Sequence, residues 1–180
     1  NLYVADGGTL SAGGVVTLVS DTPIWEAAHV GAMWEIRLKD GASSPVWTTA
    51  TAYTLGQEVL NGDLFYRCTD AGTSGTEAPT HDIGEAYDGA STTVAAKWRY
   101  IHNGRGVVII TGFTNAQQVI ATVITEVPAG CVGDENATGR WKEGAWSGVQ
   151  GYPRAVAIHE SRLVWGGTAQ EPLALDLSNT

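Results

Sequence analysis

Short apolar runs recur from one end of the chain to the other. They are rich in Val, Ile, Thr and aromatic residues and are bounded by Gly, Asn, Asp or Pro, which is typical of strands. The 23 glycines argue against long helices, because each costs about 1 kcal/mol relative to Ala inside a helix. At most a short helical turn fits residues 25–30. The pattern predicts an all-β protein with strands at 14–20, 32–38, 58–60, 64–69, 97–101, 107–112, 119–127, 155–159 and 162–165.

Two runs also indicate which faces are covered. In "VIATVITEV" (119–127) the alternation predicts one buried face, carrying Val119, Ala121, Val123, Thr125 and Val127, and an opposite face that is only partly buried. "RGVVIITG" (105–112) is apolar throughout, and we expect it to be covered on both faces.

Three turns follow from short polar segments. Asn61-Gly62 lies between two apolar runs and predicts a β-hairpin with a type I′ turn. Asn103-Gly104 predicts a second turn, into the strand at 107–112. Residues 159–161 are expected to form a tight turn between the last two strands.

Changes of composition divide the chain. We expect residues 1–40 and 103–146 to be two halves of one small β-barrel or sandwich, with a small β module inserted at 41–102. Residues 147–180 are interpreted as the start of a further β region. A lone hairpin is only marginally stable in water. The strands of this region must therefore join either the rest of this chain or a larger domain that has been cut away. We favour the second alternative, a truncated region.

The net charge and the lack of long apolar runs exclude some classes of partner, and the cysteine content limits the possible disulfides. Ten Lys and Arg against 19 Asp and Glu give a net charge of −9, which disfavours nucleic acid. No apolar run approaches the ~20 residues that span a bilayer, so no membrane partner is expected. Cys68 and Cys131 could form one bridge, but two reduced, buried thiols are favoured.

The sequence contains no recognisable catalytic or metal-binding motif. The four histidines lack the spacing of a helical zinc site, and no phosphate-binding loop, nucleophile elbow or dinucleotide fingerprint is present. We therefore expect no enzyme activity, no catalytic residues, no metal and no cofactor.

The aromatic residues of the middle segment allow two interpretations. They could form the core of a small β module, which we favour for Tyr66 and Trp98, or a flat face for sugar rings. Trp47 and Tyr53 lie outside the regular strands, and burial and exposure are equally expected for them.

Several segments resemble known families. "W…Y..G..V..NGDLFYRC…TSG…P" is similar to chitin-binding carbohydrate-binding modules, although Cys68, Thr69 and Asp70 stand where those modules usually carry Trp. "TSGTEAPTHDIGEAYDG…KWRY" resembles a loop of phage tail and tail-fibre modules, which implies an ordered loop held by Pro79 and by turns at Gly75, Gly84 and Gly89.

The strongest resemblance is to tail proteins of short-tailed phages. "WRYIHNGRGVVIITGFTNAQQVIATVITEVP" resembles a small β-barrel module of phage virion proteins. "PIWEAAHVGAMWEI" and "AWSGVQGYPRAVAIHESRLVWGGTAQEPLALDLSN" resemble segments of tail proteins of the nozzle or tubular type. The resemblance implies a structural virion protein of the phage tail that acts through interfaces with other tail or virion proteins and with copies of itself.

An alternative function follows from the first resemblance. The chain would be a carbohydrate-binding module that attaches a phage tail or a lytic protein to bacterial surface polysaccharide. Trp47, Tyr53 and Tyr66 would then stack on sugar rings, and Asp63 and His81 would supply hydrogen bonds.

Overall fold

The computed structural model describes residues 1–39, 44–88 and 95–178, and it confirms the all-β class. No helix in these ranges reaches seven residues; the helical segments are three 3₁₀ turns, η1 (Ala27–His29), η2 (Ala129–Cys131) and η3 (Asp134–Asn136). The first of them lies within the expected turn at 25–30. All pairings between the named strands are antiparallel.

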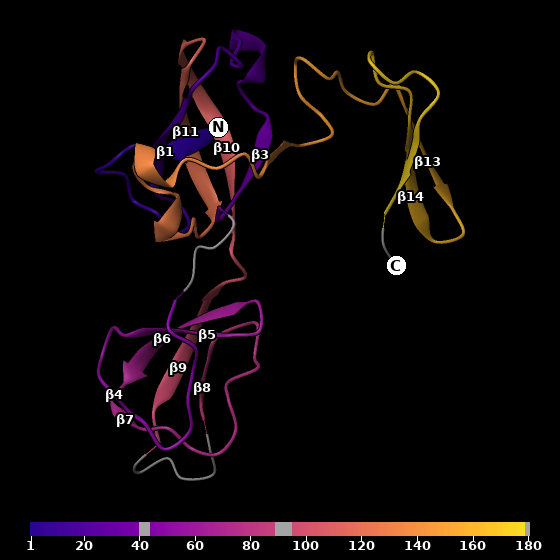
Figure 1. Ribbon diagram of the computed structural model, residues 1–180. Helices are drawn as coiled ribbons and strands as arrows, with labels where there is room; N and C mark the ends of the chain where they lie inside the picture. The colour runs from indigo at the N-terminus through magenta and orange to yellow at the C-terminus, as the bar shows by residue number, and fades with distance from the viewer. Residues whose placement is uncertain (40–43, 89–94, 179–180) are drawn as a thin grey trace.

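The largest sheet is curled into a half-barrel and has the strand order β1-β2-β11-β10-β3-β12 (Figure 1). Its strands are β1 (Leu2–Val4), β2 (Val15–Ser20), β3 (Met33–Arg37), β10 (Arg105–Asn115), β11 (Gln118–Thr125) and β12 (Trp141–Glu143). Isolated bridges join Leu2 to Thr138 and Val4 to Val132, so the segment that leads into β12 also lines the β1 edge. One apolar core fills this half-barrel, with Leu18, Ile36 and Ile110 among its buried members.

Between β3 and β10 the chain forms two smaller sheets, which we call the middle unit. They are β5-β6-β9-β8 and β4-β7. Their strands are β4 (Ala52–Tyr53), β5 (Glu58–Asn61), β6 (Leu64–Asp70), β7 (Gly72–Thr73), β8 (Glu85–Tyr87) and β9 (Lys97–His102). A separate core packs around Tyr66 and Trp98. The expected domain boundary near residue 41 lies outside the described residues, and the division into domains stays a prediction.

A third sheet, which we call the C-terminal sheet, has the order β13-β14-β15. Its strands are β13 (Ala155–His159), β14 (Arg162–Gly166) and β15 (Leu175–Leu177). The expected tight turn is present: Glu160 and Ser161 connect β13 to β14 with φ of 48° and 63°. Figure 1 shows this sheet standing apart from the half-barrel, to which the segment after β12 connects it.

The pattern at 119–127 is confirmed except at Thr125, which is exposed, whereas the expectation for β10 is wrong. Val119 and Val123 are buried, while Ile120 and Ile124 are exposed. In β10, however, Gly106, Val108 and Ile110 are buried, while Val107 and Ile109 are only half-buried. The half-barrel has a core on one side only, so an apolar strand inside it is not covered on both faces.

The Asn61-Gly62 hairpin is confirmed, but its turn type is not. Asn61 pairs with Leu64, so the two turn residues are Gly62 and Asp63. Only Gly62 has a positive φ, of 60°. A positive φ at the first turn residue alone is the pattern of a type II′ turn. The Asn103-Gly104 turn also forms, but it connects β9 to β10, which belong to different sheets.

This turn supports a stability prediction. A Cβ at Gly62 would have no heavy atom within 4 Å, so the cost of a side chain there is the backbone strain alone. We expect Gly62→Val to lower the free energy of unfolding by about 1–2 kcal/mol, because a β-branched residue disfavours positive φ. Asp63→Ala, at a position without positive φ, serves as the control. Guanidinium denaturation that gives equal stability for both variants would contradict the turn assignment.

Candidate interaction surfaces

The expected stacking face of the middle unit does not form. Tyr66 is fully buried and Tyr53 is 8% exposed, and both belong to the core around Trp98. Burial raises the pKa of Tyr66 to about 12, with Tyr100 and Asp82 adding to the shift. Tyr53 lies on β4 and Tyr66 on β6, in the two small sheets of the middle unit, and both side chains are buried in the core that these sheets share. The core interpretation of Tyr66 and Trp98 is thus confirmed, and the assignment of Tyr53 and Tyr66 to sugar stacking is corrected.

The other three candidate residues lie in different places. Trp47 is half-buried and donates from Nε1 to Asp88 Oδ2 (2.9 Å). Asp63 is exposed at the tip of the β5–β6 hairpin and lines a cavity shared with the half-barrel. His81 lies against the Tyr66 ring (centroids 5.0 Å apart) and lines a different cavity. The structure therefore does not bring the five residues together into one site.

A buried carboxylate organises the middle unit. Asp88 is 2% exposed, and its Oδ2 accepts hydrogen bonds from the indole Nε1 of Trp98 (2.7 Å) as well as Trp47. Its Oδ1 accepts from the backbone N of Gly75 (3.2 Å). The sequence does not indicate this buried role, because Trp47, one of the two indoles that define it, is 41 residues away along the chain.

The loop after β7 is ordered where the structure describes it. The Pro79 carbonyl accepts a hydrogen bond from Asn61 Nδ2 (3.0 Å), and the His81 carbonyl accepts one from the Tyr66 hydroxyl (2.7 Å). Gly84 has a φ of 73°, as a turn there requires. The contact at Pro79 and the bend at Gly84 confirm two of the expected features. No turn is present at Gly75, and Gly89 lies outside the described residues. This loop is a structural element of the middle unit.

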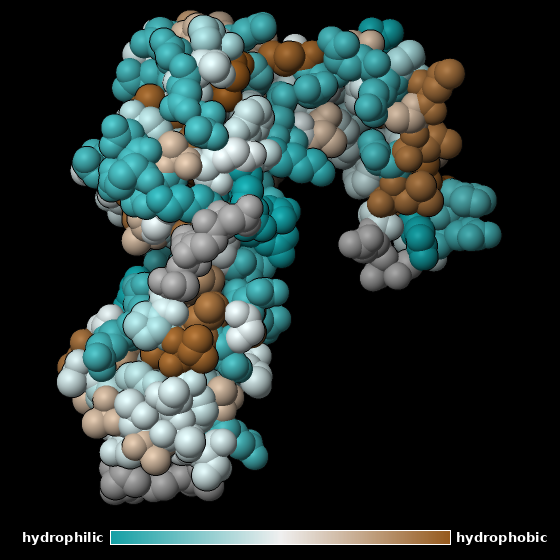
Figure 2. Space-filling model, viewed as in Figure 1, coloured by the Kyte–Doolittle hydropathy of each residue, from teal (hydrophilic) through white to brown (hydrophobic). Residues whose placement is uncertain are grey.

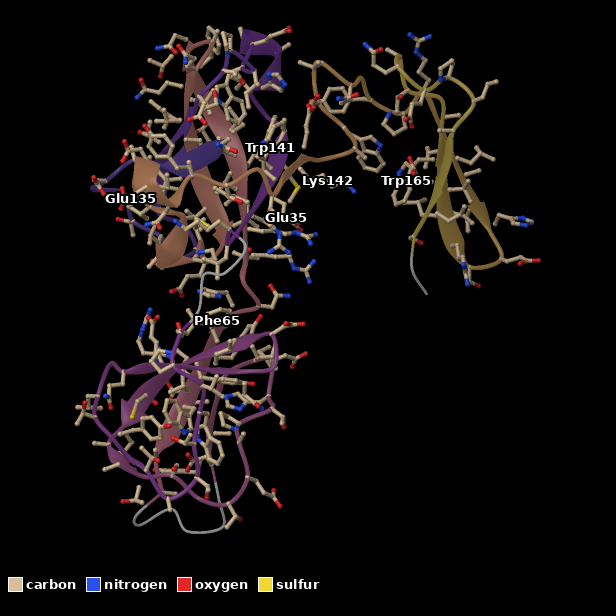
Figure 3. All side chains as sticks on the ribbon, in the orientation of Figure 1. Glu35, Phe65, Glu135, Trp141, Lys142 and Trp165 are labelled. Atoms are coloured by element: carbon tan, nitrogen blue, oxygen red, sulfur yellow. The ribbon has the colours of Figure 1, made fainter. Side chains whose placement is uncertain are left out.

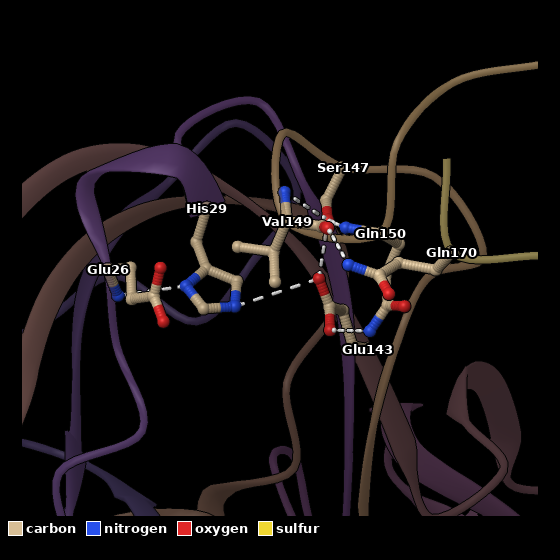
Figure 4. A network of polar contacts seen from close by, with 7 residues as sticks. All are labelled: Glu26, His29, Glu143, Ser147, Val149, Gln150 and Gln170. Carbon is tan, nitrogen blue, oxygen red and sulfur yellow. Dashed lines mark hydrogen bonds and ion pairs between the residues drawn. The ribbon is translucent and has the colours of Figure 1, made fainter. Parts of the chain in front are cut away.

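A polar network at the end of the half-barrel contains a Ser, a His and a Glu (Figure 4). His29 Nδ1 accepts from the backbone N of Glu26 (2.9 Å), so the ring proton is on Nε2, which lies 3.7 Å from Glu143 Oε1. Ser147 donates from Oγ to the same carboxylate oxygen (2.6 Å). Gln150 Nε2 donates to Glu143 Oε2 (2.9 Å).

The order of these contacts is not that of a nucleophilic triad. In a triad the hydroxyl donates to the His, which acts as the base. Here Ser147 donates to the Glu, accepts hydrogen bonds from the backbone N of Val149 and Gln150, and is fully buried. The network holds the segment after β12 against the half-barrel.

Both cysteines are thiols in the interior of the protein. Cys68 and Cys131 are both free and buried, as favoured from the sequence. Burial raises the pKa of the Cys131 thiol to about 12 and raises that of Cys68. Within residues 1–39, 44–88 and 95–178, no three His, Cys, Asp or Glu side chains gather in a way that could hold a metal ion.

The C-terminal sheet carries apolar side chains on both faces. The pairs Val156–Trp165 and Ile158–Leu163 place four of them on one face. On the other face, Leu177 lies opposite Val164. Ile158 is 80% exposed and Leu175 is 69% exposed. Figure 2 shows the resulting apolar surface along this sheet. Trp165 alone has a described aromatic partner, Trp146 (centroids 5.1 Å apart).

Comparisons with protein-family models and with curated proteins give no match to this chain. In the described part of the chain, no helix is both long and apolar enough to cross a membrane.

Proposed function

We propose that this chain is a structural protein of a phage virion, a segment of a tail nozzle or tubular assembly that acts through protein–protein interfaces. The observation that supports this most is the C-terminal sheet, which has solvent-exposed apolar residues on both faces. Large exposed apolar surfaces mark interaction sites in folded proteins. The sequence resemblance to nozzle and tubular tail proteins covers the same strands.

Copies of the same chain are the partners that we assign to this sheet. A sheet that is apolar on both faces needs cover on both, and a repeating assembly supplies a neighbour on each side. Homo-oligomers are mostly closed and symmetric, so a ring of copies is the arrangement that follows. In this function the chain is not an enzyme, and its location is the phage tail.

The alternative function as a carbohydrate-binding module has weaker support. It relied on a stacking face from three aromatic residues, of which Tyr53 and Tyr66 are in the core. Trp47 is half-buried and its indole nitrogen is bonded to Asp88. We therefore propose the interface function in preference to sugar stacking by this aromatic group.

Exchanging one exposed residue of the C-terminal sheet tests the interface. We expect Ile158→Lys to weaken self-association at least tenfold, because a charge then replaces an apolar side chain that burial would stabilise by about 2 kcal/mol. Ile83→Lys is the matched control, since Ile83 is 82% exposed and lies in the middle unit. Sedimentation over a range of concentrations measures both. Equal effects of the two variants, or a wild-type chain that stays monomeric throughout, would contradict the proposal.

A further inference from the structure

Basic side chains gather on the outer face of the half-barrel, next to the middle unit. Arg105 and Arg37 are directly opposite each other on β10 and β3. The backbone N of Arg37 donates to the carbonyl of Arg140 (2.9 Å), which places Arg140 on the other side of Arg37. Three arginines on three neighbouring chain segments thus form one row, which we call the arginine row. Figure 3 shows nitrogen-tipped side chains gathered beside the labelled Glu35.

The arginine row lines a cavity of about 530 Å³ between the half-barrel and the middle unit. Lys39 also lines it, so four of the chain's ten Lys and Arg residues surround one cavity in a protein of net charge −9. Like charges directly opposite each other on paired strands are destabilising. Glu35 relieves part of this repulsion, since it is paired with Arg37 and lies 3.8 Å from Arg105 Nη1.

The other residues that line the cavity indicate which chemical groups a ligand would need. Asp63 and Asn103 line the same cavity, and Leu60 and Leu64 supply apolar surface. The Asp63 carboxylate repels every anionic group, so the acidic groups of a ligand would lie at the arginine row, whereas Asp63 accepts hydrogen bonds from hydroxyls. Guanidinium groups bind carboxylates through paired, charge-assisted hydrogen bonds. A ligand that carries both carboxylates and free hydroxyls on a partly apolar frame satisfies all these groups.

We propose that this cavity is a binding site for an acidic oligosaccharide. The sugar carboxylates bind along the arginine row, and the hydroxyls bind to Asp63 and Asn103. The site is separate from the C-terminal sheet and uses none of Trp47, Tyr53 and Tyr66, although Phe65 of the middle unit also lines the cavity. It gives the chain a glycan-binding function that is independent of assembly.

Trigalacturonate is a suitable probe, with maltotriose as the neutral sugar of equal length. We expect trigalacturonate to bind in calorimetric titration and maltotriose to bind at least tenfold more weakly. Affinity for trigalacturonate should fall as salt is raised from 50 to 300 mM, because partly exposed charges are screened (on the order of a 10 Å Debye length at 0.1 M). No binding of trigalacturonate at millimolar concentration, or equal binding of the two sugars, would overturn the proposal.

Variants locate the site. The double variant Arg37→Gln, Arg140→Gln should weaken trigalacturonate binding at least tenfold. The double variant Arg37→Lys, Arg140→Lys keeps both positive charges and so serves as a control for a folding defect. Its affinity for trigalacturonate should fall by an intermediate factor, because Lys lacks the planar guanidinium group. Arg99→Gln is the control, since Arg99 is an exposed arginine of the middle unit paired with Glu85. An equal loss in Arg99→Gln, or tighter binding of a polyglutamate peptide or an oligothymidylate than of the sugar, would overturn the assignment.

Discussion

Replacing Asp88 with Ala is expected to lower the stability of the middle unit by about 3–5 kcal/mol, because an unpaired buried donor costs about 1–3 kcal/mol and the change leaves two indole N–H groups unpaired. Trp98 is fully buried, so its Nε1 cannot turn to water instead. The substitution also removes the acceptor for Gly75 and releases the loop that leads to β8. Chemical denaturation followed by tryptophan fluorescence measures the loss.

Two further variants separate this role from a general effect of charge. Asp88→Asn should be intermediate, because an amide keeps one acceptor but presents a donor toward either an indole or the Gly75 N–H. Asp82→Ala removes a carboxylate from the same loop at an exposed position and should stay within about 0.5 kcal/mol of the wild type. If Asp88→Ala were no less stable than Asp82→Ala, the buried carboxylate would not organise the middle unit.

Acid is expected to destabilise the chain through His102, which ends β9 where the chain leaves the middle unit. The residue is 8% exposed and packs against the Phe65 ring (centroids 4.6 Å apart). Burial lowers the pKa of His102 to about 4; Arg67 adds to the shift, while Glu58 and a backbone hydrogen bond oppose it. Its Nδ1 accepts from the backbone N of Gly104 (3.1 Å), so the neutral ring carries its proton on Nε2.

The direction of the pH effect follows from the lowered pKa. The unfolded chain binds a proton at His102 below about pH 6.5 while the folded chain does not, so stability is complete above that pH and falls toward pH 4. Between pH 7 and 5 the loss is about 2 kcal/mol, at about 1.4 kcal/mol per pH unit. His102→Gln should lack this part of the pH dependence, and the difference between the two profiles isolates it. Parallel profiles for the two proteins would show that His102 does not titrate as a buried neutral group.

The longer strands could be predicted from the sequence because each carries its own alternation. β2, β3, β11 and the β5–β6 hairpin have apolar residues in a period that local geometry alone explains. Strands of two or three residues, such as β1, β4 and β12, have no period to detect and exist only through their pairing partners. The uncovered outer face of β10 was missed for a related reason, since the number of layers is a property of the whole fold.

The site residues were less predictable because their roles depend on contacts across the chain. Tyr66 and Trp98 fit the core interpretation, since strand-borne aromatics of a small module pack inward. Asp88 gave no comparable signal: its indole partners are 41 and 10 residues away. The arginine row has the same origin, because Arg37, Arg105 and Arg140 become neighbours only when β3 pairs with the segments on both sides of it.

Electron cryo-microscopy of the phage tail in which this chain is proposed to assemble tests the central proposal most directly. The account predicts this fold in repeated copies within the tail, with both faces of the C-terminal sheet covered by neighbouring polypeptide. Val156 and Ile158 on one face and Leu177 on the other should then be buried in the assembly. A particle that lacks the chain, or that contains it with this sheet facing solvent, would contradict a structural role through this interface.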